Sequence, residues 1–357
     1  MRLLVQPGDG ASALIKGIHA ANSSIQIAIF RFDQKEIEKA LAHAVSRGVS
    51  VHALIAHTNS TGAANLRKLE LRLLAAGMTV GRTAHDLRRY HGKFMIVDRR
   101  ELYLLAFNLT YHDMKRCRSF GVITRRRDLV NEAIRLFEAD ASRIPYDAAS
   151  DALVISPVNA RRKLSAFIRG TRKQLLIYDP KISDPEMLRL LNERADAGVD
   201  IQIIGKVAGG GARFAVRALA QRRLHTRTMI RDGEWAFIGS QSLRGVELDM
   251  RREAGVIFRD ARIISQLTKT FQEDWPAVAP ENSTEVLARK VAKAVAKEIP
   301  AVAPVVNSVV KEFAAAAGDL DVKLARVEAA VDAAVKEAVK EAVKDAVEET
   351  VDSAHNN

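Results

Sequence analysis

Two stretches of the chain share one pattern: HGKFMIVDRRELYLLAFNLT at residues 91–110 and HTRTMIRDGEWAFIGSQSLR at residues 225–244. They align without a gap at a constant offset of 134, and the alignment extends over 91–130 and 225–264. Each stretch begins with a histidine that is followed two residues later by a cation and seven residues later by an aspartate. Agreement at this density indicates an internal duplication rather than two strand-rich segments of similar composition.

A second repeated pattern lies upstream of each stretch. In the first half, residues 25–30 are typical of a strand, residues 33–48 of a helix and residues 49–55 of another strand. The same order returns in the second half, at 175–178, 183–198 and 199–205. Each predicted helix ends at a glycine directly before a Val-rich strand, as a helix C-cap requires. The pattern therefore predicts a βαβ unit that occurs twice.

The expected fold class is α/β, with two copies of one module, residues 1–145 and 150–276, related by an approximate two-fold axis. Residues 284–354 differ, because Ala, Val, Lys and Glu dominate them and predict a helical tail. A valine recurs every fourth residue from Val327 to Val351. That spacing drifts by about 40° per step around a helix and makes a poor heptad zipper. A solvated tail, self-association and binding along a membrane surface all stay open.

Charge is divided unevenly along the 357 residues, which carry a net charge of +12. Residues 281–357 hold 10 Lys/Arg and 14 Asp/Glu, which leaves 45 basic and 29 acidic residues for the first 280. A basic body of this kind favours an anionic partner, either nucleic acid, a phospholipid surface or a phosphate ester. A generic basic surface is the alternative. The acidic bias of the tail argues against its attraction to anionic lipid.

Cysteine content and hydropathy bear on the compartment. Cys117 is the only cysteine, so no internal disulfide can form, and this fits a reducing environment. Pro7 and Gly8 interrupt the first ten residues too early for the apolar core of a signal peptide. No apolar run reaches the roughly 18 residues that a membrane-spanning helix needs. We therefore expect a cytoplasmic protein, with peripheral contact to the inner membrane as a further expectation.

The two histidines and their neighbours form the candidate site. Residues two apart in an extended segment point to one face, so His91 and Lys93 are expected to lie together. A two-fold axis would bring them to His225 and Arg227. Several cations beside amide and hydroxyl donors suit a phosphodiester, and the pattern contains no cluster of metal-binding carboxylates. One neutral imidazole can attack phosphorus while the other, protonated, gives its proton to the leaving oxygen.

The positions around each histidine resemble the HKD motif of the phospholipase D superfamily. In the first copy these are His91, Lys93, Asp98 and Asn108; in the second they are His225, Arg227 and Asp232, with Ser240 and Ser242 in the sequence GSQS. The resemblance covers residues 1–276. It implies duplicated modules of mixed sheets flanked by helices, one active site between the two halves, a phosphohistidine intermediate, and no metal or other cofactor.

The resemblance also implies a set of site residues. The expected catalytic residues are His91, Lys93, Asp98, Asn108, His225, Arg227, Asp232 and Glu253, and Ser240 and Ser242 are expected to bind substrate. Lys93, Arg227, Asn108 and Ser242 would hold the phosphoryl oxygens as charge develops. Each such donor could contribute on the order of 3 kcal/mol.

Three departures from the family pattern shape the hypothesis. Arg227 stands in place of lysine, and Leu105 and Ala106 stand near Asn108 where Gly and Ser are usual. The family also places an acid 28 residues after each histidine, and it orients the imidazole of the opposite half. Glu253 fills this position after His225, but Ser119 fills it after His91. We therefore expect Glu253 to orient His91 and His225 to lack a carboxylate, which would make His91 the nucleophile and His225 the general acid.

The function expected from the resemblance is a phosphodiesterase that acts on phospholipids, by hydrolysis or by phosphatidyl transfer as in cardiolipin synthases. Two alternatives stay open: a phosphodiesterase nuclease on DNA or RNA, and a degenerate, inactive binder of anionic lipid or nucleic acid. Aromatic residues are only 5% of the chain, which weakens a single-strand binder that depends on stacking. The tail matches nothing in the family.

Overall fold

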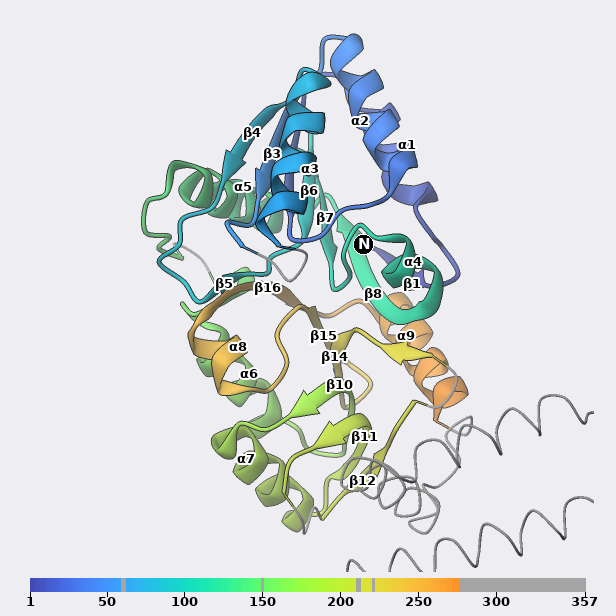
Figure 1. Cartoon of the computed structure of the whole chain (residues 1–357). Coiled ribbons are helices and arrows are strands. Elements are labelled where there is room, and N and C mark those ends of the chain that lie inside the picture. Colours follow the sequence, from blue (N-terminus) through green and yellow to red (C-terminus); the bar gives the residue numbers. More distant parts are fainter. Residues whose placement is uncertain (59–61, 149–150, 210–212, 220–221, 276–357) are drawn as a thin grey trace, which may run out of the picture. The chain divides into compact units, whose positions relative to one another are not determined.

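Two eight-stranded sheets with helices on their faces make up the computed structural model (Figure 1). The structure describes residues 1–58, 62–148, 151–209, 213–219 and 222–275, all within one compact unit, Met1–Pro280. The predicted helical tail, 284–354, lies outside the described residues. None of the described helices is both long enough and apolar enough to span a membrane.

The first half of the chain contributes β1 (Arg2–Gln6), α1 (Ser12–His19), β2 (Ser24–Ile29), α2 (Lys35–Ser46), β3 (Ser50–Ile55), α3 (Ala63–Ala75), β4 (Thr79–Arg82), β5 (Arg89–Tyr90), β6 (Phe94–Val97), β7 (Glu101–Leu105), α4 (Tyr111–Arg116), β8 (Cys117–Thr124) and α5 (Arg127–Ser142). The second half contributes β9 (Leu153–Ser156), α6 (Ala160–Arg169), β10 (Gln174–Ile182), α7 (Pro185–Asp196), β11 (Asp200–Val207), β12 (Ala215–Arg217), β13 (Arg223–Leu224), β14 (Arg227–Arg231), β15 (Trp235–Gly239), α8 (Gly245–Asp249), β16 (Arg251–Phe258) and α9 (Ala261–Asp274).

Both sheets are mixed and follow the same plan. Strand order in the first sheet is β1-β8-β7-β6-β2-β3-β4, with β13 beside β8 as its eighth strand. In the second sheet the order is β12-β11-β10-β14-β15-β16-β5, and β9 pairs with β16 as its eighth strand. The predicted βαβ units are confirmed: β2 pairs parallel with β3 across α2, and β10 pairs parallel with β11 across α7. Strands β6 to β8 and β14 to β16 then run antiparallel. The expected α/β fold with duplicated modules is confirmed, whereas the module boundaries at 145 and 150 stay a prediction.

Each half also lends one short strand to the other. Strand β5 pairs parallel with β16, through Arg89 opposite Arg251 and Tyr90 opposite Arg252. At the equivalent place β13 pairs parallel with β8, through Leu224 opposite Arg118. The two halves are thus joined by main-chain hydrogen bonds in both directions, and these joints lie directly before the two histidines.

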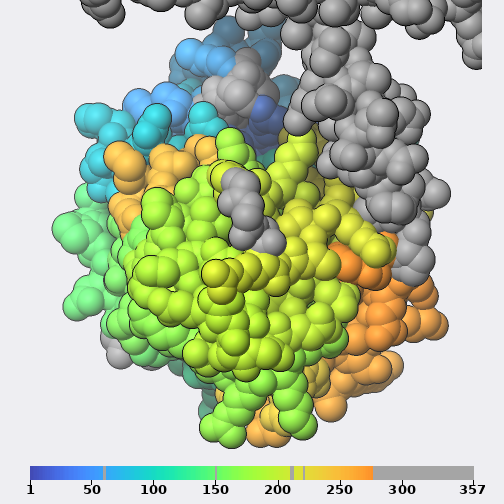
Figure 2. All heavy atoms as spheres, turned by 90° about the horizontal axis from the view of Figure 1, so that it is seen from below, coloured from blue at the N-terminus to red at the C-terminus, as the bar shows by residue number. Residues whose placement is uncertain are grey.

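Three hydrophobic cores hold the layers together. One lies between the first sheet and helices α1, α2 and α3, and another between the second sheet and helices α6, α7 and α8. The third takes residues from both halves, including Phe120 on β8 and Phe258 on β16, and it packs α5 and α9 between the sheets. Seen from below, the surface is formed mainly by the second half, with α9 at its side (Figure 2). The shared core fixes the two modules against each other.

Two buried ion pairs cross between the halves at equivalent positions. The Arg118 guanidinium donates from Nε and Nη2 to the two oxygens of Asp274, at 2.6 and 2.8 Å. Arg252 Nε donates to Asp140 Oδ1 at 3.1 Å. At the offset of 134, Arg252 corresponds to Arg118 and Asp140 corresponds to Asp274. Tyr178 adds a hydrogen bond to Asp274 at 2.7 Å. Strands β8 and β16 are therefore each tied to the helix that ends the opposite half.

We predict that Asp274→Ala lowers the free energy of unfolding by about 3–5 kcal/mol, because it leaves the buried guanidinium of Arg118 without its counterion. The matched control is Asp128→Ala, which removes the exposed pair with Arg126 and should cost less than about 1 kcal/mol. Chemical denaturation of both variants beside the native chain measures the difference. Equal losses in the two variants would contradict the role given to the crossing pair.

Candidate active site

Both histidines are anchored through their backbones to the opposite half. His91 follows β5, and its N–H donates to the carbonyl of Arg252 at 2.7 Å. His225 follows β13, and its N–H donates to the carbonyl of Arg118 at 3.0 Å. Their side chains are 9% and 10% exposed. His91 and Lys93 lie just before β6, in the connection from β5, rather than inside the strand. The short strand that each half pairs with the other therefore fixes the backbone position of the histidine that follows it.

Glu253 contacts His91 as the sequence predicts. The Nδ1 atom of His91 lies 2.7 Å from Glu253 Oε2 in a well-aligned hydrogen bond between the two halves. The carboxylate is fully buried, and burial raises its pKa. The ring of Phe30, at the end of β2, meets the imidazole edge-on with centroids 4.6 Å apart. Phe30 could not be predicted as a site residue, because an aromatic residue that follows a strand is most often part of the core.

His225 has a carboxylate neighbour too, so the expectation that it lacks one is wrong. Its Nδ1 lies 2.9 Å from Asp113 Oδ1, at ion-pair distance but without the alignment of a hydrogen bond. Asp113 sits in α4, where its N–H donates to the N-cap Thr110. The contact again crosses between the halves. A helix supplies the acid on this side, because Ser119 occupies the strand position that corresponds to Glu253.

The signal for Asp113 was present in the alignment of the two copies. Asp113 follows His91 by 22 residues, and Glu247 follows His225 by the same number. An acid thus recurs at this position in both copies, six residues before the position 28 residues after each histidine. Although burial opposes ionisation, the contacts with His225 and Asn108 hold the pKa of Asp113 below its usual value.

Asn108 and Ser242 hold these helix acids in place. The N–H and the side-chain amide of Asn108 both donate to Asp113 Oδ2, at 3.0 and 2.6 Å. In the second copy the N–H of Ser242 donates to Glu247 Oε2 at 2.8 Å. The amide donor that Asn108 was expected to offer to substrate is therefore engaged by Asp113, and its Oδ1 is buried without a hydrogen bond.

Two cations lie close enough to the imidazoles for their charges to act on both. The Lys93 ammonium, 2% exposed, donates to the carbonyl of His91 at 2.7 Å. The Arg227 guanidinium donates to the carbonyl of His225 at 3.1 Å and to Ser242 Oγ at 3.0 Å. Each cation thus folds back onto the histidine of its own half. The structure brings together His91, Lys93, Asn108, His225, Arg227, Ser242 and Glu253 from the predicted set.

Burial and the paired cations keep both imidazoles neutral. Burial, with the charges of Lys93 and Arg227, holds the pKa of His91 well below its usual value. Burial also lowers the pKa of His225 to about 4, although Asp113 opposes this shift. Burial lowers the pKa of Lys93 to about 7. A bound anion would favour the charged form of all three groups, so the resting charges are poised to change when substrate enters.

Asp98 and Asp232 do not belong to this cluster, contrary to the expectation. Asp98 lies past the far end of β6 with φ at 51°, and its carboxylate accepts the N–H groups of residues 22–24. Asp232 has φ at 54° and accepts the N–H groups of residues 172–174 in the same way. Both aspartates fasten the loop before a central strand. Their recurrence in the repeat reflects the fold rather than the chemistry.

Ser240 also acts on structure rather than on a ligand. Its side chain is fully buried, and its Oγ accepts the N–H of Ala254 at 3.1 Å within the β15–β16 ladder. The same hydroxyl donates to the carbonyl of Ala254 at 3.4 Å. Ser240 therefore joins two strands next to Glu253, and the expected contact with substrate does not follow from its placement.

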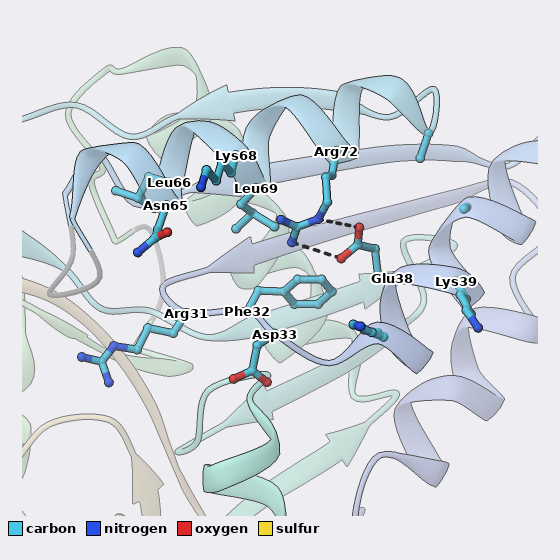
Figure 3. Close-up of a pocket in the computed structure, with 13 residues that line it drawn as sticks. Arg31, Phe32, Asp33, Glu38, Lys39, Asn65, Leu66, Lys68, Leu69 and Arg72 are labelled. Carbon is cyan, nitrogen blue, oxygen red and sulfur yellow. Dashed lines mark hydrogen bonds and ion pairs between the residues drawn. The ribbon is translucent and has the colours of Figure 1, made fainter.

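A groove of about 710 Å³ opens between α2 and α3 beside this cluster (Figure 3). It begins at Arg31, the residue after Phe30. Its apolar walls include Phe32, Leu66 and Leu69. The charged lining consists of Arg31, Lys35, Lys39, Lys68 and Arg72 with Asp33 and Glu38. An ion pair from Arg72 Nε to Glu38 Oε1, at 2.9 Å, spans the two helices. The groove therefore combines apolar surface with an excess of positive charge.

One cluster of metal-ligand type occurs among the described residues. Asp113, Cys117 and His225 are all buried, and one donor atom from each lies within 4.8 Å of the others. The Cys117 thiol contacts Asp113 Oδ1 at 3.8 Å. The sequence did not single out Cys117, since a lone cysteine in a strand is usually a packing residue.

Comparisons with known proteins agree with this geometry. A family model described as cardiolipin synthase, PLD-like domain, matches residues 14–141 and 164–275, one segment in each half. No curated protein sequence matches the chain.

Two solved structures have a similar fold. A polyphosphate kinase from Porphyromonas gingivalis is 18% identical with a TM-score of 0.64, over 76% of this chain and 49% of that one. A phosphatidylserine synthase from Haemophilus influenzae is 10% identical with a TM-score of 0.60, over 83% of this chain and 94% of that one. The chain thus spans about half the length of the kinase and nearly all of the synthase.

We predict that Lys93 sets an alkaline limit on activity. Lys93 carries charge only below its pKa of about 7, so kcat/KM for a soluble phosphodiester should fall as pH rises through that value. Lys93→Arg keeps a charge that no accessible pH removes. The alkaline limb of its profile, where kcat/KM falls, should therefore lie more than about one pH unit higher. Profiles of both proteins measure the shift. An unchanged alkaline limb in the variant would assign it to another group.

Proposed function

The chain belongs to the phospholipase D superfamily, and from this premise we propose that it cleaves or exchanges a phosphodiester bond of a phospholipid. The reaction proceeds by double displacement through a phosphohistidine. The observation that carries the proposal is the crosswise pairing of His91 with Glu253 and of His225 with Asp113 in one buried cluster. Lys93 and Arg227 supply positive charge beside both imidazoles.

His91 acts as the nucleophile in the first step. Its neutral imidazole attacks phosphorus, and the aligned carboxylate of Glu253 stabilises the imidazolium that forms. His225 gives its proton to the leaving oxygen. Asp113 favours that proton on His225, and the bound phosphodiester anion favours it further. The different settings of the two imidazoles thus support the roles first inferred from Glu253, although the premise that His225 lacked a carboxylate was wrong.

The second step reverses these roles. His225, now neutral, takes a proton from water or from an alcohol, whose oxygen attacks the phosphohistidine and releases His91. With water the product is a phosphatidic acid, and with an alcohol it is a new phosphodiester. Lys93 and Arg227 stabilise the charge on the phosphoryl oxygens in both steps, which is the kind of contribution that fixed donors make in a buried site.

The groove between α2 and α3 supports a lipid substrate. It begins at Arg31, the residue after Phe30, and it offers apolar walls together with five cations and two acids. An amphipathic anion fits such a lining better than a uniformly polar one does. The phosphatidylserine synthase with a similar fold is, by its name, an enzyme of phospholipid synthesis. That likeness concerns the fold, so the lipid substrate rests on the groove.

A nuclease is the second candidate, and the excess of basic over acidic residues in the first 280 favours it. An inactive binder of lipid or nucleic acid is the third. These readings differ in turnover and in substrate. The proposal also includes two modules, at 1–145 and 150–276. It further includes peripheral contact with a membrane and self-association of the tail, each of which is tested separately.

We predict hydrolysis of phosphatidylglycerol or phosphatidylcholine in vesicles at a rate well above nicking of a supercoiled plasmid. His91→Ala should reduce lipid turnover by at least about 10³-fold, as loss of a nucleophile does. Both assays run in parallel with the native chain and the variant, with and without a chelator. Faster plasmid nicking that His91→Ala abolishes would favour the nuclease. Binding without turnover on either substrate would favour the inactive binder.

A further inference from the structure

The contact between Asp113 and His225 contains a third donor that the phosphodiesterase proposal does not use. His225 Nδ1 lies 2.9 Å from Asp113 Oδ1, and Cys117 Sγ lies 3.8 Å from the same oxygen. A tetrahedral zinc ion with bonds of about 2.0 Å to nitrogen and oxygen and about 2.3 Å to sulfur separates its donors by roughly 3.3 to 3.5 Å. The two distances to Asp113 Oδ1 therefore lie within about half an ångström of these values, and one donor atom from each of the three residues lies within 4.8 Å of the others.

The donors are available in this arrangement. Asn108 engages Asp113 Oδ2 and leaves Oδ1 toward the cluster. His225 Nδ1 is buried and lacks a well-aligned hydrogen bond. Asp113 is 3% exposed and Cys117 is fully buried, so a metal here would replace one ion pair and one long thiol contact with three bonds. Carboxylate, thiolate and imidazole are a common ligand combination for zinc.

The other half of the cluster cannot form such a site. The residues that correspond to Asp113 and Cys117 at the offset of 134 are Glu247 and Arg251. Arg251 carries a permanent positive charge and offers no ligand. It lies 3.1 Å from Glu247 and 4.0 Å from Glu253 instead. The asymmetry of the duplication thus confines metal-ligand chemistry to the His225 side.

We propose that Asp113, Cys117 and His225 bind a thiophilic divalent cation such as Zn²⁺, and that the bound ion holds the enzyme inactive. Binding replaces the thiol proton, which leaves to solvent, while the neutral imidazole coordinates through Nδ1 and the carboxylate through Oδ1. A water fills the fourth position. The inhibitory half of this proposal rests on the proposed role of His225 as proton donor.

The inhibition follows from the proton count on the imidazole. To donate a proton from Nε2 and then accept one, His225 must pass through an imidazolium with protons on both nitrogens. A metal on Nδ1 occupies one of those positions. It also neutralises the carboxylate charge of Asp113, which favours the protonated ring. His91 and Glu253 are untouched, so substrate can still enter but the leaving oxygen receives no proton.

The test uses cobalt as a spectroscopic probe of the full chain. Titration of metal-free protein with Co²⁺ should produce a thiolate-to-cobalt charge-transfer band that saturates at one ion per chain, and Zn²⁺ should displace it. Cys117→Ser, which keeps the size of the side chain, should lose the band and bind Zn²⁺ at least about tenfold more weakly. Cys117→Ala is the second variant if the serine protein does not fold.

The activity arm is separate from the binding arm. Zn²⁺ should inhibit phosphodiester turnover by the native chain, a chelator should restore it, and Cys117→Ser should keep turnover but resist Zn²⁺. Absence of the cobalt band, or equal Zn²⁺ affinity in native and Cys117→Ser proteins, would overturn the metal site. A cobalt band without turnover on any phosphodiester would leave the site standing and refute the proposed function. Turnover that saturating Zn²⁺ leaves unchanged would overturn the inhibition.

Discussion

Two main-chain hydrogen bonds between the halves govern the rest of the site. The N–H of His91 binds the carbonyl of Arg252, and the N–H of His225 binds that of Arg118. Each bond continues a short parallel pairing in which one half lends a strand to the other. The side chains of the same two arginines form the buried ion pairs that cross between the halves. Each of these arginines therefore has two roles: its carbonyl anchors a histidine, and its side chain forms an ion pair that joins the modules.

This arrangement explains how carboxylates reach the imidazoles. Glu253 follows Arg252 on β16, so the strand that anchors His91 also carries its acid. On the other side Ser119 follows Arg118 on β8, and no acid comes from the strand. Helix α4, directly before β8, supplies Asp113 instead. The two imidazoles therefore have different carboxylate contacts: an aligned hydrogen bond for His91 and a less aligned ion pair for His225. This difference suits a nucleophile at His91 and a proton donor at His225.

The sequence alone predicted the duplication and the βαβ units, because each leaves a fixed spacing or offset. The crosswise contact of Glu253 with His91 was implied by the resemblance to the phospholipase D superfamily, and the structure shows this contact. The sequence shows an acid at the position of Asp113 in both copies but does not reveal that Asp113 meets His225, since a contact between a helix acid and a histidine 112 residues later depends on how the halves dock. It also misassigned Asp98 and Asp232. A recurring aspartate looks the same whether it binds a ligand or fastens a loop, and only the backbone conformation and the three N–H donors around each carboxylate separate these roles.

Covalent trapping tests most directly whether one site holds both histidines with His91 as the nucleophile. The native chain and His225→Ala are quenched during turnover of a phosphodiester labelled at phosphorus, and the modified residue is located by mass spectrometry. With a leaving group that needs no proton, such as a nitrophenolate, phosphohistidine at His91 that accumulates when His225 is replaced is the expected result, because attack can then proceed while the second step lacks its base. Label on His225 of the native enzyme would contradict it.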